Sequence, residues 1–171
     1  MTDSIGFKAI ASSDARVLIL GTLPSAESLK RREYYAKKEN AFWKIMGELA
    51  GACPDKPYAE RQSCLKQKRI ALWDVCASAK RVGSLDAKIQ SATIVANDFC
   101  SFFKAHKQIE LICFNGQPAE KLFCRFVLPS LPLSVVGLRR ETLPSTSPAH
   151  AQMRFEEKLK RWREVLQEFI A

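Results

Sequence analysis

One stretch of the chain combines aromatic, cationic and amide side chains closely enough for them to act together. Residues 34–43 are Tyr-Tyr-Ala-Lys-Lys-Glu-Asn-Ala-Phe-Trp, so two tyrosines and two lysines precede Asn40 and two further rings. Aromatic rings interleaved with ammonium groups suit a base stacked on a ring and a phosphate held by a cation. The alternative is structural: the rings form a core cluster, and Asn40 is the N-cap of the helix that follows.

A second stretch is rich in hydroxyl groups. Residues 144–150 are Pro-Ser-Thr-Ser-Pro-Ala-His. Ser147 followed by Pro148 predicts a helix start, with a hydroxyl N-cap before a proline at the first helical position. Hydroxyls and free backbone N–H groups at a helix N-terminus form a natural phosphate site. The alternative interpretation is a plain helix cap.

A third stretch, residues 21–29, follows the apolar run Val17-Leu18-Ile19-Leu20. It contains neither G-x-G-x-x-G nor a G-K-[ST] ending, which excludes the standard dinucleotide-binding and P-loop sites. From the residues alone, an ordinary strand-to-helix turn is an equal alternative to a functional loop.

Metal and triad chemistry have little support. The cysteines are widely spaced, without a C-x-x-C pair: Cys53, Cys64, Cys76, Cys100, Cys113 and Cys124. This spacing argues against zinc and iron–sulfur sites, and we expect small core residues instead. With only His106 and His150 available, a His-based zinc site or a Ser-His-Asp triad is also weakly supported. We expect no metal and no cofactor.

The strands that position these stretches are short apolar runs. We predict strands over residues 16–21, 69–75 and 109–114, and a shorter fourth strand over 132–136. Helical spacing predicts helices over residues 40–51, 58–68, 97–105 and 118–126. Such alternation implies a parallel sheet covered on both faces. The loops after Leu20, Trp73 and Phe114 should then meet the segment before Ser147 at the carboxyl edge of the sheet.

The final segment gives the clearest helical pattern. Its apolar side chains recur at intervals of three and four residues: Phe155, Leu159, Trp162, Leu166 and Phe169. This spacing draws one apolar stripe along a helix. We predict that this helix starts at Ser147.

Length and charge limit the class of protein. The 171 residues fit a single domain over 1–171, and the apolar runs are too short to span a bilayer. The net charge of +9 favours nucleic acid as a partner, although a generically basic enzyme is the alternative. The chain begins without the pattern of a secretory signal, so we expect a cytoplasmic protein, without a membrane partner and monomeric.

Taken together, the motifs resemble those of the uracil-DNA glycosylase superfamily, and within it most of all the hypoxanthine-DNA glycosylases. They occur in the order Gly21-Thr22-Leu23-Pro24, Tyr34-Tyr35, Asn40-Ala41-Phe42-Trp43, Ala71-Leu72-Trp73-Asp74-Val75, Gly83-Ser84-Leu85-Asp86, Phe114-Asn115-Gly116 and Ser145-Thr146-Ser147-Pro148-Ala149. The resemblance implies an α/β fold, a three-layer α/β/α sandwich around a central, mostly parallel four-stranded sheet. It also implies removal of a deaminated base from DNA by hydrolysis of the N-glycosidic bond, without metal or cofactor.

The resemblance assigns roles to individual positions. Leu23 stands where some members carry a catalytic carboxylate, so the catalytic role passes to Asn40, which would orient water and base. Ser25 replaces a glycine, Ser145 a histidine and Ala149 a bulky wedge residue. We expect base contacts from Thr22, Leu23, Tyr35, Asp74, Asn115 and Ser145, and phosphate contacts from Lys37, Lys38, Ser145, Thr146 and Ser147.

Two of these side chains carry specific expectations. Tyr35 should stack on the flipped base rather than fill the core. Asp74 could accept the N–H on the pairing edge of hypoxanthine or uracil, or it could be a structural acid that caps a loop.

Two functions follow from the sequence. The first is a DNA glycosylase of base-excision repair whose partner is DNA containing deaminated bases, with hypoxanthine favoured and uracil or xanthine next. The second is a catalytically silent nucleic-acid or nucleotide-binding module on the same scaffold, supported by Leu23, Ser25 and Ser145. Formation of an abasic site distinguishes the two.

Overall fold

Four strands form one parallel sheet in the computed structural model, which describes residues 2–170. The strands are β2 (Val17–Gly21), β3 (Ile70–Asp74), β6 (Leu111–Asn115) and β7 (Arg139–Leu143), in the order β3-β2-β6-β7. Val17 of β2 pairs with Ile70 on one side and with Leu111 on the other. The predicted four-stranded sheet is confirmed, and within it all pairs are parallel.

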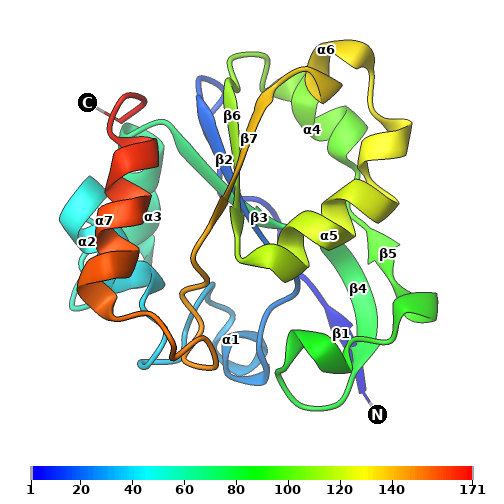
Figure 1. The fold of residues 1–171 in the computed structure, drawn as a ribbon, viewed down its shortest axis with the longest axis horizontal. Helices are drawn as coiled ribbons and strands as arrows, with labels where there is room; N and C mark the ends of the chain where they lie inside the picture. The colour runs from blue at the N-terminus through cyan, green and yellow to red at the C-terminus, as the bar shows by residue number, and fades with distance from the viewer. Residues whose placement is uncertain (1, 171) are drawn as a thin grey trace.

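Helices cover both faces of this sheet (Figure 1). On one face lie α2 (Phe42–Ala50), α3 (Tyr58–Gln67) and α7 (Phe155–Leu166), and on the other α4 (Phe99–Ala105), α5 (Gln117–Phe126) and α6 (Leu133–Val136). Strand β2 is buried along its whole length. Because side chains alternate along a strand, Val17 and Ile19 join one hydrophobic cluster while Leu18 and Leu20 join the other. The α/β/α sandwich is therefore confirmed.

Four helices occur close to where their apolar spacing predicted them. Helix α2 ends at Gly51, whose positive φ of 71° is easy for glycine. Helix α4 buries Phe99, Phe102 and Phe103, as expected. The observed bounds of α3 and α5 differ from the predicted ones by one residue at one end.

The predicted strand over residues 132–136 is wrong. Leu133–Val136 forms the short helix α6, in which the Val135 and Val136 N–H groups donate to the Pro132 carbonyl. The fourth strand is β7, which begins at Arg139. This strand is at the edge of the sheet and starts with two exposed arginines, so it lacks the apolar run of a central strand.

The predicted start of the last helix is also wrong. Helix α7 begins at Phe155. The residue before it, Arg154, is the N-cap, and its N–H donates to Glu157 Oε2 at 2.9 Å. Ser147 instead begins a turn: its carbonyl accepts from the His150 N–H at 3.0 Å. The apolar stripe is confirmed at its centre, where Trp162 and Leu166 are fully buried, but Phe169 lies beyond the end of the helix.

A second sheet was not predicted. Strands β1 (Thr2–Ile5), β4 (Cys76–Arg81) and β5 (Val95–Ala96) form an antiparallel sheet in the order β1-β4-β5 (Figure 1). Strand β4 follows β3 almost directly, so the sequence has no loop that marks where one strand ends and the other begins. The remaining short elements are α1 (Ala26–Arg31) and the 3-10 helices η1 (Asp86–Lys88), η2 (Ser91–Thr93) and η3 (Leu128–Ser130). Within residues 2–170, no helix has the length and apolarity needed to span a bilayer.

Candidate active site

The carboxyl ends of the four parallel strands bring the predicted loops together. Gly21 at the end of β2 pairs with Asp74 at the end of β3, and Asn115 at the end of β6 pairs with Leu143 at the end of β7. The stretches after β2 and β7 therefore meet at one edge of the sheet, as parallel topology requires. The stretch over residues 34–43 joins them through the Ala41 N–H, which donates to the Thr146 carbonyl.

Gly21 lies against two polar side chains. A Cβ at this position would be 2.5 Å from Asp74 Oδ1 and 2.8 Å from Tyr35 Oη, which leaves no room for any side chain. Asp74 Oδ2 and the Tyr35 hydroxyl are both buried, and neither has a hydrogen-bond partner within residues 2–170. Buried polar atoms are nearly always paired, so two orphaned oxygens at one place indicate a site where a polar ligand or water is bound.

Burial changes the acidity of Asp74. Removal from water, followed by the charge of Asp86, raises the pKa of this carboxyl from 3.8 to about 7, while the Arg81 guanidinium opposes the shift. Asp74 therefore changes its ionisation near neutral pH. Such a group is a candidate for binding or catalysis.

Tyr35 combines an aromatic surface with unusual backbone geometry. Its φ is 53°, in the left-handed region that non-glycine residues rarely adopt. Its ring stacks on Phe42 with centroids 4.1 Å apart and an interplanar angle of 23°. The side chain is half-buried and packs against the main core cluster. Tyr35 thus contributes to the core as well as to the site, which corrects the expectation that it lies outside the core.

Asn40 precedes α2 and uses only part of its amide. Its Oδ1 accepts from the Phe42 N–H at 3.0 Å, the first N–H of α2, but the N-cap position of this helix is Ala41 and not Asn40. Its Nδ2 has no hydrogen-bond partner within the described part of the chain, and the residue is half-buried. The predicted N-cap is therefore wrong by one residue, although the Asn40 oxygen still pairs with the start of the helix, and the NH2 group is available to a ligand.

Thr146 connects the hydroxyl-rich stretch to both neighbouring elements. Its N–H donates to Asn115 Oδ1 and its Oγ1 accepts from Asn115 Nδ2, both at 2.9 Å. Its carbonyl accepts from the Ala41 N–H, also at 2.9 Å. Thr146 is only 1% exposed. Asn115 therefore holds Thr146, and Thr146 in turn fixes the backbone next to Asn40.

Ser145 lies against the turn after β6. A Cβ on Gly116 would be 3.0 Å from the Ser145 Cβ, and Gly116 has a φ of 92°. The Ser145 hydroxyl accepts from the Ser147 N–H at 3.2 Å. Because Ser145, Thr146 and Ser147 lie outside any helix, well before α7, the predicted phosphate site at a helix N-terminus is wrong as a helix site.

The loop after β2 is held by β4 and the segment that follows it. Thr22 Oγ1 donates to Asp86 Oδ1 at 2.6 Å. Leu23 is buried and packs its side chain with Cys76 and Ala79, so the predicted base contact does not come from an exposed side chain. Ser25 caps α1 by accepting from the Ser28 N–H at 3.1 Å.

Arg81 was missed by the sequence analysis. It is 1% exposed, and its guanidinium donates to the carbonyls of Leu23, Pro24 and Gly83. It fixes the loop after β2 and supplies a positive charge near Asp74 and Asp86. One arginine in a strand pattern gives no local sign of this role, because the carbonyls of Leu23 and Pro24 lie nearly sixty residues away.

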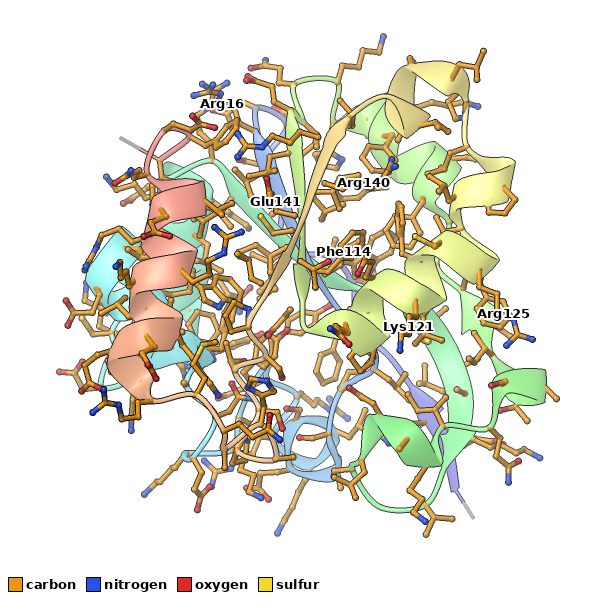
Figure 2. All side chains as sticks on the ribbon, viewed as in Figure 1. Arg16, Phe114, Lys121, Arg125, Arg140 and Glu141 are labelled. Carbon is orange, nitrogen blue, oxygen red and sulfur yellow. The ribbon has the colours of Figure 1, made fainter. Side chains whose placement is uncertain are left out.

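Exposed cations surround this edge. Lys37 and Lys38 are exposed in the turn before Asn40. An open hollow of about 250 Å³ lies beside Asp86, lined also by Pro118 and Lys121. Figure 2 shows Lys121 and Arg125 on α5, the helix that follows Gly116. Lysines in these places suit contact with a phosphate backbone.

The residues at this edge offer no metal site. Within residues 2–170, no group of three or more His, Cys, Asp or Glu side chains could hold a metal ion. All six cysteines are free. Cys76 and Cys113 are buried as expected for core residues, but Cys124 is exposed, so the expectation holds only in part.

Comparisons with known proteins give a consistent result. Residues 7–170 match the family model of the uracil DNA glycosylase superfamily. The chain is 36% identical over 146 residues to a Hypoxanthine DNA glycosylase of Methanosarcina acetivorans, covering 85% of this chain and 87% of the relative. It is 34% identical over 152 residues to a Hypoxanthine DNA glycosylase of Methanosarcina barkeri, covering 86% and 95%.

A solved structure is similar over nearly the whole chain. It is the solution NMR structure of a candidate uracil DNA glycosylase from Methanosarcina acetivorans. It superposes with a TM-score of 0.80 at 32% identity, covering 98% of this chain and 99% of that one.

Proposed function

The chain belongs to the uracil DNA glycosylase superfamily, and we propose that it removes hypoxanthine from DNA by hydrolysing the N-glycosidic bond. Water adds across the bond between C1′ of the sugar and N9 of the base, which leaves an abasic site and free hypoxanthine. The observation that carries the proposal is the NH2 group of Asn40, which has no partner within the described residues and lies next to the backbone held by Thr146, in a chain similar to two hypoxanthine DNA glycosylases. Such an enzyme acts where the DNA is, inside the cell.

The base must leave the duplex before it can react. Flipping costs a few kcal/mol, and least for a weakly paired lesion. Stacking on the Tyr35 ring returns roughly 1–3 kcal/mol. Because the ring is backed by Phe42 and fixed by an unusual backbone conformation, it is ordered before the base arrives. This order lowers the entropy lost on binding.

Asn40 then acts on the reacting groups. Cleavage leaves positive charge on the sugar and negative charge on the base, so a donor near the base stabilises the transition state. An amide takes up no proton near neutral pH, and Asn40 therefore orients rather than deprotonates water. Its oxygen already accepts from the Phe42 N–H, which holds the NH2 group in a fixed direction.

Asp74 reads the pairing edge of the base. Hypoxanthine carries a hydrogen on N1, whereas N1 of adenine is an acceptor. An ionised Asp74 accepts from the first and repels the lone pair of the second. Its unpartnered Oδ2 supports this role, because a buried carboxylate oxygen without a donor is otherwise costly. Thr22 and Asn115 support base binding indirectly, because their side chains fix the loops around the base. Lys37 and Lys38 contact phosphates.

A panel of labelled duplexes tests the function. Each strand carries one hypoxanthine, uracil, xanthine or G·T mismatch, and alkali cleaves it wherever an abasic site has formed. We expect cleavage at hypoxanthine first. Binding without cleavage of any strand would refute the glycosylase and leave the silent binding module.

A further inference from the structure

Helix α7 holds the loop between β7 and itself at two points, its start and its middle. Trp162 Nε1 donates to the Pro144 carbonyl at 3.0 Å, and Lys158 Nζ donates to the His150 carbonyl at 2.7 Å. Residues four positions apart lie on one face of a helix, so Lys158 and Trp162 act from the same side of α7. The segment they hold contains the hydroxyl-rich stretch of the candidate site.

The two anchors leave a short exposed tip between them. Thr146 is fixed by Asn115 and Ala41, and His150 is fixed by Lys158. Pro148 and Ala149, between these points, are exposed, and Ser147 is half-buried. Among the described residues, the tip has only local hydrogen bonds: Ser147 Oγ accepts from the Ala149 N–H at 3.2 Å, and the Ser147 carbonyl accepts from the His150 N–H at 3.0 Å. Its shape therefore depends on the position of the His150 carbonyl.

Lys158 is a costly residue for this position. It is 5% exposed, and no ion pair within residues 2–170 involves it. Burial lowers the pKa of its ammonium group. A buried cation without a counter-ion opposes folding, and methionine would fill a similar volume without that cost. Among the described residues, the hydrogen bond to the loop is the one polar interaction that offsets this cost. Packing alone therefore does not account for a lysine at this position.

We propose that Lys158 is a positioning residue, which fixes the His150 carbonyl and so keeps the tip 147–149 in the shape that contacts DNA. The inference rests on the proposed function, because it assigns the tip to DNA. A tip ordered in the free protein loses less conformational freedom when DNA binds. Lys158 touches neither base nor sugar in this account, and its effect falls on affinity rather than on bond cleavage.

Three variants separate position from charge and from stability. Lys158→Met removes the anchor, Lys158→Arg keeps a donor, and Lys160→Met removes the same charge from an exposed position on the same helix. Single-turnover rates are measured over a range of enzyme concentrations on a hypoxanthine duplex. We expect Lys158→Met to raise the half-saturating concentration about three- to tenfold with a maximal rate within about twofold of wild type. Lys158→Arg should give a half-saturating concentration close to that of wild type, and Lys160→Met should change this concentration less than about twofold.

Other outcomes would overturn the inference. A lower maximal rate at unchanged half-saturation would mean that Lys158 only supports folding, and thermal melts of each variant check the folded fraction. An equal shift in Lys160→Met would mean that charge alone matters. Hydrogen exchange gives an independent measurement: the amides of Ala149 and His150 should exchange faster in Lys158→Met than in Lys160→Met.

The design also distinguishes failure of the inference from failure of the proposed function. If the wild-type protein releases no base, the proposed function is wrong, and the fluorescence anisotropy of the same labelled duplex still gives the affinity of each variant. Equal affinity of Lys158→Met and wild type would then refute the positioning role by itself.

Discussion

Asp74 is the residue whose chemistry depends most on its surroundings. Burial and the charge of Asp86 raise its pKa to about 7 in the folded protein, whereas an unfolded chain titrates near 3.8. Between these values the folded state binds more protons than the unfolded state, so this group's contribution to stability falls as the pH rises from about 4 to about 7. The proposed acceptor is the ionised form. The rate of base release should therefore rise as the pH approaches about 7, while the stability falls over the same pH range.

Asp74→Asn should remove both pH dependences. We expect the rate of base release by the wild type to increase through about pH 7. The rate of the variant should be low and should not change with pH. The free energy of unfolding of wild type relative to the variant should drop by a few kcal/mol between pH 5 and pH 8, on the scale of about 1.4 kcal/mol per pKa unit. Single-turnover rates and urea melts across this range measure both. Parallel pH profiles for the two proteins would count against Asp74.

Tyr35 provides a second test at the residue scale. Since its ring packs on Phe42, Tyr35→Ala should cost about 1–3 kcal/mol of stability as well as activity. Tyr35→Phe keeps the ring and removes a buried hydroxyl without a partner, so it should fold at least as stably as wild type. Melts of the two variants, compared with their base-release rates at a temperature where both are folded, separate stacking from folding. A Tyr35→Ala protein that is folded and fully active would contradict the stacking role.

At the scale of elements, the bridge between β6 and the loop after β7 should matter most. Thr146→Val keeps the shape of the side chain but leaves Asn115 Nδ2 without its acceptor. We expect a loss of about 1–3 kcal/mol in stability. We also expect a base-release rate about tenfold lower, because the Thr146 carbonyl holds the backbone beside Asn40.

The matched control for this bridge is Thr142→Val on β7. The Thr142 hydroxyl makes no hydrogen bond within the described residues, and valine suits a strand. The stability of this variant in urea melts and its single-turnover rate should both be close to those of wild type. Equal effects of the two substitutions would show that the bridge has no special role.

Elements with apolar periodicity could be predicted from the sequence, and elements defined by distant partners could not. Central strands such as β2 and helices such as α4 bury continuous or regularly spaced apolar residues. Strand β7 is an edge strand with exposed arginines, so its pairing with β6 leaves little trace in its own residues. Ser147 and Pro148 fit a helix start and a turn equally well, and the anchors at Thr146 and His150 select the turn.

The same distinction applies to the site. Asn40, Tyr35 and Asp74 could be named because they stand in local motifs, and Asp74 ends β3 at the carboxyl edge of the sheet. Arg81 contacts the Leu23 carbonyl, which is far away in the sequence, and Lys158 contacts the His150 carbonyl in the loop before its own helix. Neither contact is marked by a local pattern.

For the whole molecule, the charge of +9 should appear as salt-dependent binding. Each phosphate contact contributes about −0.9 to the slope of log affinity against log salt. We expect a slope that corresponds to three or more contacts. Lys37→Gln with Lys38→Gln should reduce it by about 1 to 2.

The control for this slope is Lys104→Gln with Lys107→Gln, a pair that is exposed at the opposite edge, before β6 begins. Its slope should stay close to that of wild type. Anisotropy titrations at several salt concentrations measure all three proteins. A slope near zero for wild type would remove the role assigned to the charge.

The most direct test of the account is the single-turnover rate of Asn40→Asp on a hypoxanthine duplex. The carboxylate can still accept from the Phe42 N–H, so the start of α2 and the fold should survive, which thermal melts verify. The substitution removes the donor to the departing base and adds a charge that repels the developing anion. We predict a folded protein whose rate of hypoxanthine release is about one to three orders of magnitude below wild type. A rate close to wild type would contradict the catalytic role and leave Asn40 with only its hydrogen bond to the start of α2.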